Sequence, residues 1–290
     1  MRKLRVLKII TICLFLLAVI LYLAIPIGFG GYASVRHSAP VGDPPEGFKE
    51  LTLTTNDGVK LAAWYAPPKN GAAIVLIHGA TGSRENIRPY AHMLAGNGFG
   101  VLAFDLRGHG ESGGGGNAFG WEGTRDVNAA MAYLLEQDNI EAIGGLGISL
   151  GGEVLLGAAS ASPELKAIVS DGASHRSTDD YLILPSQRSL FRSWTTRLMY
   201  VSTHLFSGDT PPITMLDSIE GSQGTPLLLI AAGNDSKEID YNSRFLEAAG
   251  PGSELWIVPD VGHTGAYQRY PDDYMKRILA FFELLLKERS

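Results

Sequence analysis

Residues 147–151 read Gly147-Ile148-Ser149-Leu150-Gly151, and they lie between a run typical of a buried strand and a run typical of a helix. The run 140–148 predicts the strand, and the small residues of 150–160 predict a helix that packs close to a sheet. The two glycines allow a sharp strand-to-helix turn with the serine at its tip. A serine hydroxyl becomes a useful nucleophile when such a turn presents it to a base and an oxyanion site. We therefore expect Ser149 to be a catalytic nucleophile.

The composition narrows the class of protein. The chain has 290 residues, enough for one large domain with its own core. Hydrophobic residues make up 45% and charged residues 19%, which excludes a disordered chain. The net charge is -6 and no long basic run follows the N-terminus, so nucleic-acid binding is disfavoured. The single cysteine, Cys13, excludes a disulfide framework and a cysteine-based metal site.

The N-terminus has the pattern of a membrane anchor. Four basic residues within 1–8 precede an uncharged run, and the next charged residue is Arg36. From Ile9 to Phe29, a helix would span roughly 31 Å, about one bilayer core. We expect a cytoplasmic basic tail (1–8), a single transmembrane signal anchor (9–30) and a catalytic domain outside the cytoplasm. The alternative is a signal peptide, cleaved near Gly31 or Ala33 to release a secreted protein.

The rest of the chain predicts one α/β domain. Residues 31–47 contain glycines and prolines and predict a short linker, and the folded domain occupies 48–290. Asn56-Asp57-Gly58 predicts a hairpin turn between two strands. Apolar runs that predict further strands alternate with helical patterns at 89–97 and 124–136 and near the C-terminus; these runs are 72–77, 100–104, 165–170, 227–231 and 255–258. This alternation favours a doubly wound, mostly parallel sheet that helices cover on both faces, with antiparallel strands at one edge.

One segment, 174–224, is too long for a simple connection between two strands. It contains one amphipathic helical pattern with three arginines nearby. The apolar positions are Leu190, Phe191, Trp194, Leu198, Val201 and Leu205, and the arginines are Arg188, Arg192 and Arg197. We expect a small helical cap over the carboxyl ends of the strands.

A nucleophilic serine needs a base, and the base needs an acid that orients it. His263 lies in a glycine-flanked loop after the last strand, where the sites of doubly wound sheets form, and is the expected base. Asp235 follows the strand 227–231 and is the favoured acid. Asp171, after the preceding strand, is the main rival, and Asp240 and Asp260 are weaker ones that also suit turns.

The oxyanion of an acyl-transfer reaction needs two backbone N–H donors. Leu150 follows the nucleophile at a helix N-terminus, where the helix dipole favours negative charge. The loop His78-Gly79-Ala80-Thr81-Gly82 follows an earlier strand, and Ala80 is the expected second donor. His78 itself is expected to brace this loop rather than take part in chemistry.

The motifs together resemble the α/β-hydrolase superfamily. Ser149, Asp235 and His263 come in the family's order, and the His78-Gly79 loop and the run Phe104-Asp105-Leu106-Arg107-Gly108-His109-Gly110-Glu111-Ser112 match its pattern over 48–287. Among subgroups, the chain is similar to membrane-anchored α/β-hydrolase-domain and prolyl-oligopeptidase-like proteins. The resemblance implies an eight-stranded sheet, no cofactor, and a structural loop built by the residues 105, 107 and 109. The segment 236–240 departs from the short apolar-proline segment usual after the acid.

The expected function is a serine hydrolase that cleaves a carboxylic or thio ester of a hydrophobic, lipid-like acyl group through an acyl-enzyme. The alternatives are an aminopeptidase or acyltransferase with the same triad, a cofactor-free lyase, and a non-catalytic binding protein on the same scaffold. Metal catalysis is disfavoured because the sequence has neither a His-Glu-x-x-His helix nor clustered metal-ligand spacing.

Overall fold

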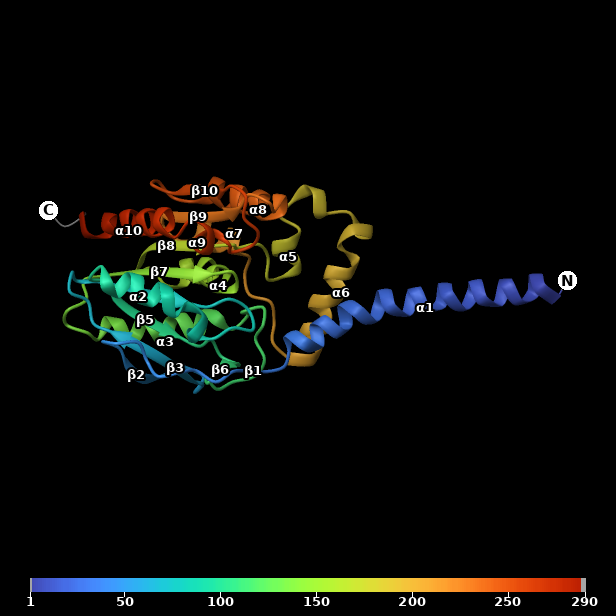
Figure 1. Ribbon diagram of the computed structural model, residues 1–290, viewed down its shortest axis with the longest axis horizontal. Helices are drawn as coiled ribbons and strands as arrows, with labels where there is room; N and C mark the ends of the chain where they lie inside the picture. Colours follow the sequence, from blue (N-terminus) through green and yellow to red (C-terminus); the bar gives the residue numbers. More distant parts are fainter. Residues whose placement is uncertain (1, 288–290) are drawn as a thin grey trace.

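Eight strands form one sheet in the order β10-β9-β8-β7-β4-β5-β3-β2 (Figure 1). The computed structural model describes residues 2–287, except for the side chains of Arg2, Phe191, Arg192 and residues 284–287. The strands are β2 (Lys49–Thr54), β3 (Lys60–Ala66), β4 (Ala72–Ile77), β5 (Gly100–Phe104), β7 (Ala142–Ile148), β8 (Leu165–Asp171), β9 (Leu227–Ala232) and β10 (Glu254–Val258). The sheet has the predicted strand number, and its neighbours are parallel except where β3 pairs antiparallel with β2 and β5.

The predicted hairpin forms between β2 and β3. The amide of Thr55 donates to the carbonyl oxygen of Val59 at 2.9 Å, and Gly58 adopts φ +85° at the turn. Such a left-handed conformation favours glycine, which explains why Asn56-Asp57-Gly58 marks the turn so clearly in the sequence.

Helices cover both faces of the sheet, as predicted. One face carries α3 (Gly123–Leu135), α4 (Leu150–Ala158), α7 (Met215–Glu220) and α8 (Ser236–Ala248). The other carries α2 (Arg88–Gly96) and α10 (Pro271–Lys287). Short elements are β1 (His37–Ser38), β6 (His109–Gly110), α9 (Ala266–Arg269) and the 3₁₀ turns η1 (Arg84–Ile87), η2 (Ala159–Ala161) and η3 (Pro185–Gln187). The central strands are buried on both faces, so their sequences read as continuous apolar runs.

The chain order reverses between β4 and β7. From β4 the chain continues to β5 on one side, whereas β7, β8, β9 and β10 follow one another on the other side. Ile77 pairs with Gly147, so the loops that leave β4 and β7 begin next to each other. Such a switch point at the carboxyl edge is where doubly wound sheets form their sites.

Helix α4 packs very close to the sheet at its first turn. A Cβ atom on Gly151 would lie 2.4 Å from the carbonyl oxygen of Ile77, and one on Gly152 would lie 2.3 Å from Oγ of Ser170. Both distances are far below van der Waals contact. Only glycine therefore lets α4 start directly above the strands.

The predicted cap lies between β8 and α7. Helices α5 (Thr178–Tyr181) and α6 (Leu190–Ser207) stand beyond the carboxyl edge of the sheet (Figure 1). Met215 and Ile219 of α7, however, are buried in the core against the sheet. The predicted cap boundary of 174–224 is therefore too long at its carboxyl end. The amphipathic pattern of α6 forms the predicted helix, and two of its predicted members, Phe191 and Arg192, have side chains outside the described part of the structure.

Helix α1 (Arg2–Ala33) extends away from the domain, and only its carboxyl end packs on the protein (Figure 1). It is long and apolar enough to cross a membrane, a test that a signal sequence also passes. Its buried face is formed by Pro26, Gly30 and Ala33 at helical spacing. A Cβ on Gly30 would lie 2.7 Å from the carbonyl oxygen of Met199, so α1 and α6 are in backbone contact there.

The predicted linker is docked on the domain rather than free. Residues 31–33 continue α1, and β1 pairs with β6 in a parallel two-stranded sheet. Arg36 donates from Nη2 to the carbonyl oxygen of Ser112 at 2.6 Å, and the amide of Ala118 donates to the carbonyl oxygen of Ala33. The glycines and prolines of 31–47 indicate a largely irregular path, which the structure has, but no pattern in this segment predicts that it packs on the domain.

Replacing Gly151 by alanine tests the close crossing of α4. We expect Gly151→Ala to destabilise the fold by about 1–3 kcal/mol, because the new methyl group meets backbone that cannot move independently. Gly96→Ala is the matched control, since no atom lies within 4 Å of a Cβ at that helical position. The control is expected to stabilise by about 0.4–1 kcal/mol. Thermal unfolding followed by circular dichroism checks both, and equal effects of the two variants would contradict the packing argument.

Candidate active site

Ser149 occupies a strained turn between β7 and α4. Its backbone adopts φ +51° and ψ −117°, a region that non-glycine residues rarely enter. The amide of Ser149 donates to the carbonyl oxygen of Asp171 at 2.6 Å, which fixes the turn to β8. Strain of this kind costs about 1–3 kcal/mol and persists where the surroundings determine the conformation. The predicted sharp turn with serine at its tip is therefore present.

The structure brings His263 to Ser149 from 114 residues away in the chain. Nε2 of His263 lies 2.8 Å from Oγ of Ser149. The histidine follows β10 in a tight loop, in which the amide of Gly265 donates to the carbonyl oxygen of Gly262 at 2.9 Å. The imidazole side chain is 48% exposed, so the site opens to its surroundings.

The acid that contacts His263 is Glu238, a residue that the sequence did not single out. Its Oε2 lies 2.6 Å from Nδ1 of His263, and its Oε1 accepts the amide hydrogen of Ala232 at 2.7 Å. The Glu238 side chain is only 2% exposed. Its hydrogen bond raises the pKa of His263 above the ordinary value, against the opposite effect of partial burial.

Asp235, the predicted acid, has another role in the structure. It is the N-cap of α8, and its Oδ1 accepts the amide hydrogens of Lys237 at 3.0 Å and Glu238 at 3.1 Å. Because α8 begins directly after Asp235, the side chain turns back to the helix end that needs acceptors. Glu238, three residues later, reaches the histidine instead. The placement of the acid at Asp235 is therefore wrong, although the loop after β9 was the right one.

None of the rival aspartates contacts His263 by a hydrogen bond. Asp171 is buried at the end of β8 and accepts a hydrogen bond from the hydroxyl of Tyr274 at 2.9 Å. Burial raises its pKa to about 7. Asp240 is exposed on α8, and Asp260 is exposed in a turn with φ +57°.

The two expected oxyanion donors lie on segments that meet at the elbow. Leu150 is the first residue of α4, where helix amides lack partners within the helix. A Cβ on Gly79 would lie 3.4 Å from Cβ of Ser149, so the backbone of the loop that carries Ala80 touches the serine. Ala80 is exposed beside it. The pairing of β4 with β7 explains this approach.

Buried polar residues hold this loop, as predicted for His78. Nδ1 of His78 lies 2.7 Å from the carbonyl oxygen of Gly79, and Nε2 of the same ring accepts the amide hydrogen of Leu106 at 3.1 Å. Complete burial lowers the pKa of His78 to about 4, so the ring is neutral and Nδ1 carries the proton. The neighbouring loop is fixed in the same way, because Asp105 accepts the amide hydrogens of Arg84 at 2.5 Å and Glu111 at 2.9 Å.

Arg107 and His109 likewise have structural contacts. Arg107 donates to Asp126 at 2.7 Å and to Asp57 at 2.8 Å, and Nδ1 of His109 lies 3.0 Å from the carbonyl oxygen of Arg107. Among the described residues, no group of three His, Cys, Asp or Glu side chains is arranged to hold a metal ion.

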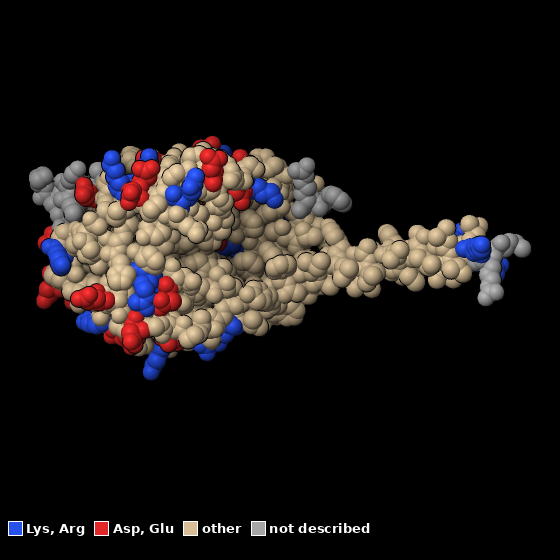
Figure 2. Space-filling view, in the orientation of Figure 1, with Lys and Arg blue, Asp and Glu red and all other residues tan. Residues whose placement is uncertain are grey.

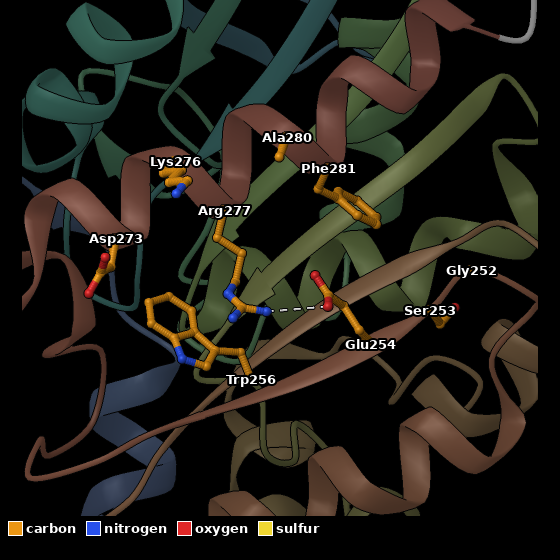
Figure 3. A pocket seen from close by; sticks show the side chains of 9 residues that line it. All are labelled: Gly252, Ser253, Glu254, Trp256, Asp273, Lys276, Arg277, Ala280 and Phe281. Carbon is orange, nitrogen blue, oxygen red and sulfur yellow. Dashed lines mark hydrogen bonds and ion pairs between the residues drawn. The ribbon is translucent and has the colours of Figure 1, made fainter.

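A cavity of about 820 Å³ lies elsewhere, beside the edge strand β10 (Figure 3). It is lined by Glu254, Trp256 and Arg277, among others, and Arg277 pairs with Glu254 at 3.3 Å. This groove faces α10 near the beginning of β10, whereas His263 follows the end of that strand. The groove is therefore separate from the candidate site, which is the hydrogen-bonded set of Ser149, His263 and Glu238 at the carboxyl edge.

Comparisons with known proteins agree with this geometry. A family model described as alpha/beta hydrolase fold matches residues 72–190. An uncharacterised protein of Mycobacterium tuberculosis is 28% identical over 230 residues, covering 74% of this chain and 72% of that protein. A thiohydrolase, aneE, of Aspergillus aculeatus is 34% identical over 138 residues, covering 42% of this chain and 41% of that protein.

Among solved structures, the Pyrococcus furiosus esterase Pf2001 superposes with a TM-score of 0.68 and 26% identity, covering 85% of this chain and 97% of that one. Two of these relatives are named as hydrolases, one an esterase and the other a thiohydrolase. With its eight-stranded sheet and its strained serine elbow, the chain has the α/β-hydrolase fold.

Proposed function

We propose that the protein is a serine hydrolase that cleaves carboxylic or thio esters through a Ser149–His263–Glu238 triad. The observation that carries this proposal is the continuous chain of hydrogen bonds, 2.8 Å from serine to histidine and 2.6 Å from histidine to glutamate. This is the arrangement by which a base activates a serine and an acid orients the base. The likeness to an esterase and a thiohydrolase supports the ester or thioester bond as the target.

The mechanism follows from the position of the protons. The buried Glu238 carboxylate accepts a hydrogen bond from Nδ1–H of His263, which leaves Nε2 without a hydrogen and able to take the proton of Ser149. Ser149 then attacks the acyl carbonyl, and the amides of Leu150 and Ala80 stabilise the oxyanion. His263 returns its proton to the leaving group. Water, activated by the same histidine, hydrolyses the acyl-enzyme.

Two other reactions use the same triad, and the choice between them depends on the acceptor and the bond. An aminopeptidase would cleave a peptide amide, and an acyltransferase would pass the acyl group to an alcohol or amine rather than to water. We propose an ester with a hydrophobic acyl group, because the exposed face of the cap helix α6 is apolar. Rates with short-chain esters, long-chain esters, thioesters and aminoacyl amides distinguish the three reactions.

We further propose that α1 anchors the protein in a membrane with the catalytic domain outside the cytoplasm. The basic residues at the N-terminal tip of α1 and its uncharged length support this orientation (Figure 2). N-terminal sequencing of the mature protein tests it. Retention of residues 1–33 agrees with an anchor, and a new N-terminus near Gly31 or Ala33 indicates a cleaved signal peptide.

Replacement of the nucleophile tests the proposed chemistry directly. We expect the wild type to react with a fluorophosphonate probe and Ser149→Ala to lose both labelling and ester hydrolysis, by about 10⁴-fold or more in kcat. Ser186→Ala, which removes an exposed serine of the cap, is the control and should keep both. Equal labelling of Ser149→Ala and the wild type would refute the proposal.

A comparison of two carboxylate variants tests which acid orients His263. Glu238→Gln should lower kcat by about 10²–10⁴-fold, because an amide neither fixes the Nδ1 proton nor stabilises the imidazolium. Asp235→Asn should change kcat less than about threefold, since asparagine caps a helix nearly as well as aspartate. The opposite ranking would return the role to Asp235.

The pH dependence supplies an independent test. His263 must be neutral to accept the serine proton, so activity is lost as the pH falls through the pKa of His263. Because Glu238 raises that pKa, its removal should move the acid limb of the kcat/KM profile to lower pH. We expect the residual activity of Glu238→Gln to persist at pH values where the wild type has lost most of its own. An unchanged or raised midpoint would contradict the assignment.

A further inference from the structure

Helix α6 has its polarity reversed relative to an ordinary surface helix. Its exposed face carries Leu190, Trp194, Val201 and Leu205, the last with 73% of its surface exposed. Its buried positions include Ser193, Tyr200, Ser202 and Thr203. A helix in contact with water places apolar residues inside and polar residues outside. The exposed face of α6 is therefore suited to an apolar environment outside the protein.

The buried hydroxyls of α6 do not require water. Ser193, Ser202 and Thr203 donate to the carbonyl oxygens four residues earlier, at 3.0 Å, 2.6 Å and 2.9 Å. The hydroxyl of Tyr200 donates to the carbonyl oxygen of His175 at 3.1 Å and also lies 2.6 Å from Nδ1 of that residue. With its polar groups satisfied from within, the helix can present its apolar side outward.

Helix α6 contacts α1 within the uncharged run that would lie in the bilayer. A groove of about 330 Å³ is lined by Tyr22, Ile25 and Phe29 of α1 and by Thr195, Thr196 and Met199 of α6. If the apolar part of α1 spans a membrane, α6 lies at the depth of its final turns, that is, at the border of one leaflet. Figure 2 shows an uncharged surface that continues from the cap side of the domain along α1.

The charges of α6 fit the same environment. Its sequence contains no Asp or Glu, whereas Arg192 and Arg197 belong to it and Arg188 is exposed just before it. Exposed aromatic residues accompany them at Trp194 on α6 and Tyr32 on α1. Apolar residues with arginines and an interfacial tryptophan are the features of helices that lie flat in the headgroup region of a membrane.

The chain also connects α6 to the reacting residues. Tyr200 of α6 holds His175, and His175 ends a short segment that begins at Gly172. A Cβ on Gly172 would lie 2.9 Å from Cε1 of His263, so this segment touches the proposed base. The segment 172–175 thus contacts the cap helix at one end and the proposed base at the other. The cap helix lies on the side of the domain from which α1 departs (Figure 1).

We propose that α6 lies in the leaflet border of the same membrane that α1 crosses, and that the site takes lipid esters from that leaflet. The occupant of the exposed face is the bilayer, because α6 packs against the apolar run of α1 and an uncharged surface continues from the cap side of the domain along that helix (Figure 2). The substrate class rests on the proposed hydrolase function, but the placement of α6 does not.

Fluorescence quenching in membranes tests the placement. The full-length protein with Cys13→Ser is reconstituted into vesicles of phosphatidylcholine and phosphatidylglycerol. Leu205→Cys in that background is labelled with an environment-sensitive fluorophore. Leu135→Cys is the matched control, because Leu135 is also an exposed leucine, 57% accessible, but lies on α3 over the sheet. We expect blue-shifted emission and at least twofold quenching by lipids brominated on the acyl chain at position 205, and neither effect at position 135.

Two outcomes would overturn the placement. Emission at position 205 equal to that at position 135 would mean that α6 stays in water. A blue shift at 205 without quenching by brominated lipid would mean that a protein surface, such as a second copy of this chain, covers the helix instead.

Enzyme rates test the substrate class. Leu205→Glu should lower hydrolysis of a long-chain ester embedded in the vesicles by about tenfold or more. It should leave hydrolysis of a water-soluble short-chain ester unchanged, which also reports that the variant is folded. Leu135→Glu should change neither rate. Equal rates of Leu205→Glu and wild type on the embedded ester would refute delivery of the substrate from the leaflet. If the wild type hydrolysed no ester at all, the hydrolase function would be refuted, but the placement of α6 from the quenching experiment would still hold.

Discussion

The strained backbone of Ser149 is the constraint on which the arrangement of this molecule depends. A residue with φ +51° at the end of a strand holds its position only if the strand before it and the helix after it are both fixed. The amide of Ser149 is bonded to β8, and the glycines at the start of α4 let that helix begin in contact with the strand ends. The hydroxyl thereby stands above the sheet at the position where the loops after β4, β9 and β10 meet. The rest of the site consists of residues that those loops bring to one place.

Much of this arrangement could be predicted because it is encoded locally. Apolar runs of strand length, the Asn56-Asp57-Gly58 turn and the glycines around Ser149 each specify a structure from a few neighbouring residues. His263 could be placed for a similar reason, since a glycine-flanked loop after the last strand has a known position at the carboxyl edge. The sequence therefore predicted the sheet, its helical layers and the meeting of Ser149 with His263.

The acid could not be placed in the same way. Asp235 and Glu238 are three residues apart, and either reaches the carboxyl edge. The choice depends on where α8 begins, and the boundaries of a helix are the part of it that sequence patterns define least well. Once the helix starts at Ser236, an aspartate directly before it caps the helix and a glutamate in its first turn projects toward the histidine. The unusual segment 236–240 was the available signal, because it placed a longer carboxylate one helical turn further on.

The docking of the linker and the boundary of the cap were missed because both depend on contacts between distant segments. Gly30 against Met199 and Arg36 against Ser112 join residues far apart in the chain, and neither contact can be recognised from a local sequence pattern.

The close packing of α1 on α6 has a practical consequence for biochemistry. A chain shortened to begin at Phe48 would lack the helix against which the backbone of α6 rests, together with the strand that pairs with β6. The apolar helix α1 is thus part of the architecture of the cap, and a truncated form without it would differ from the full chain in the region of the cap.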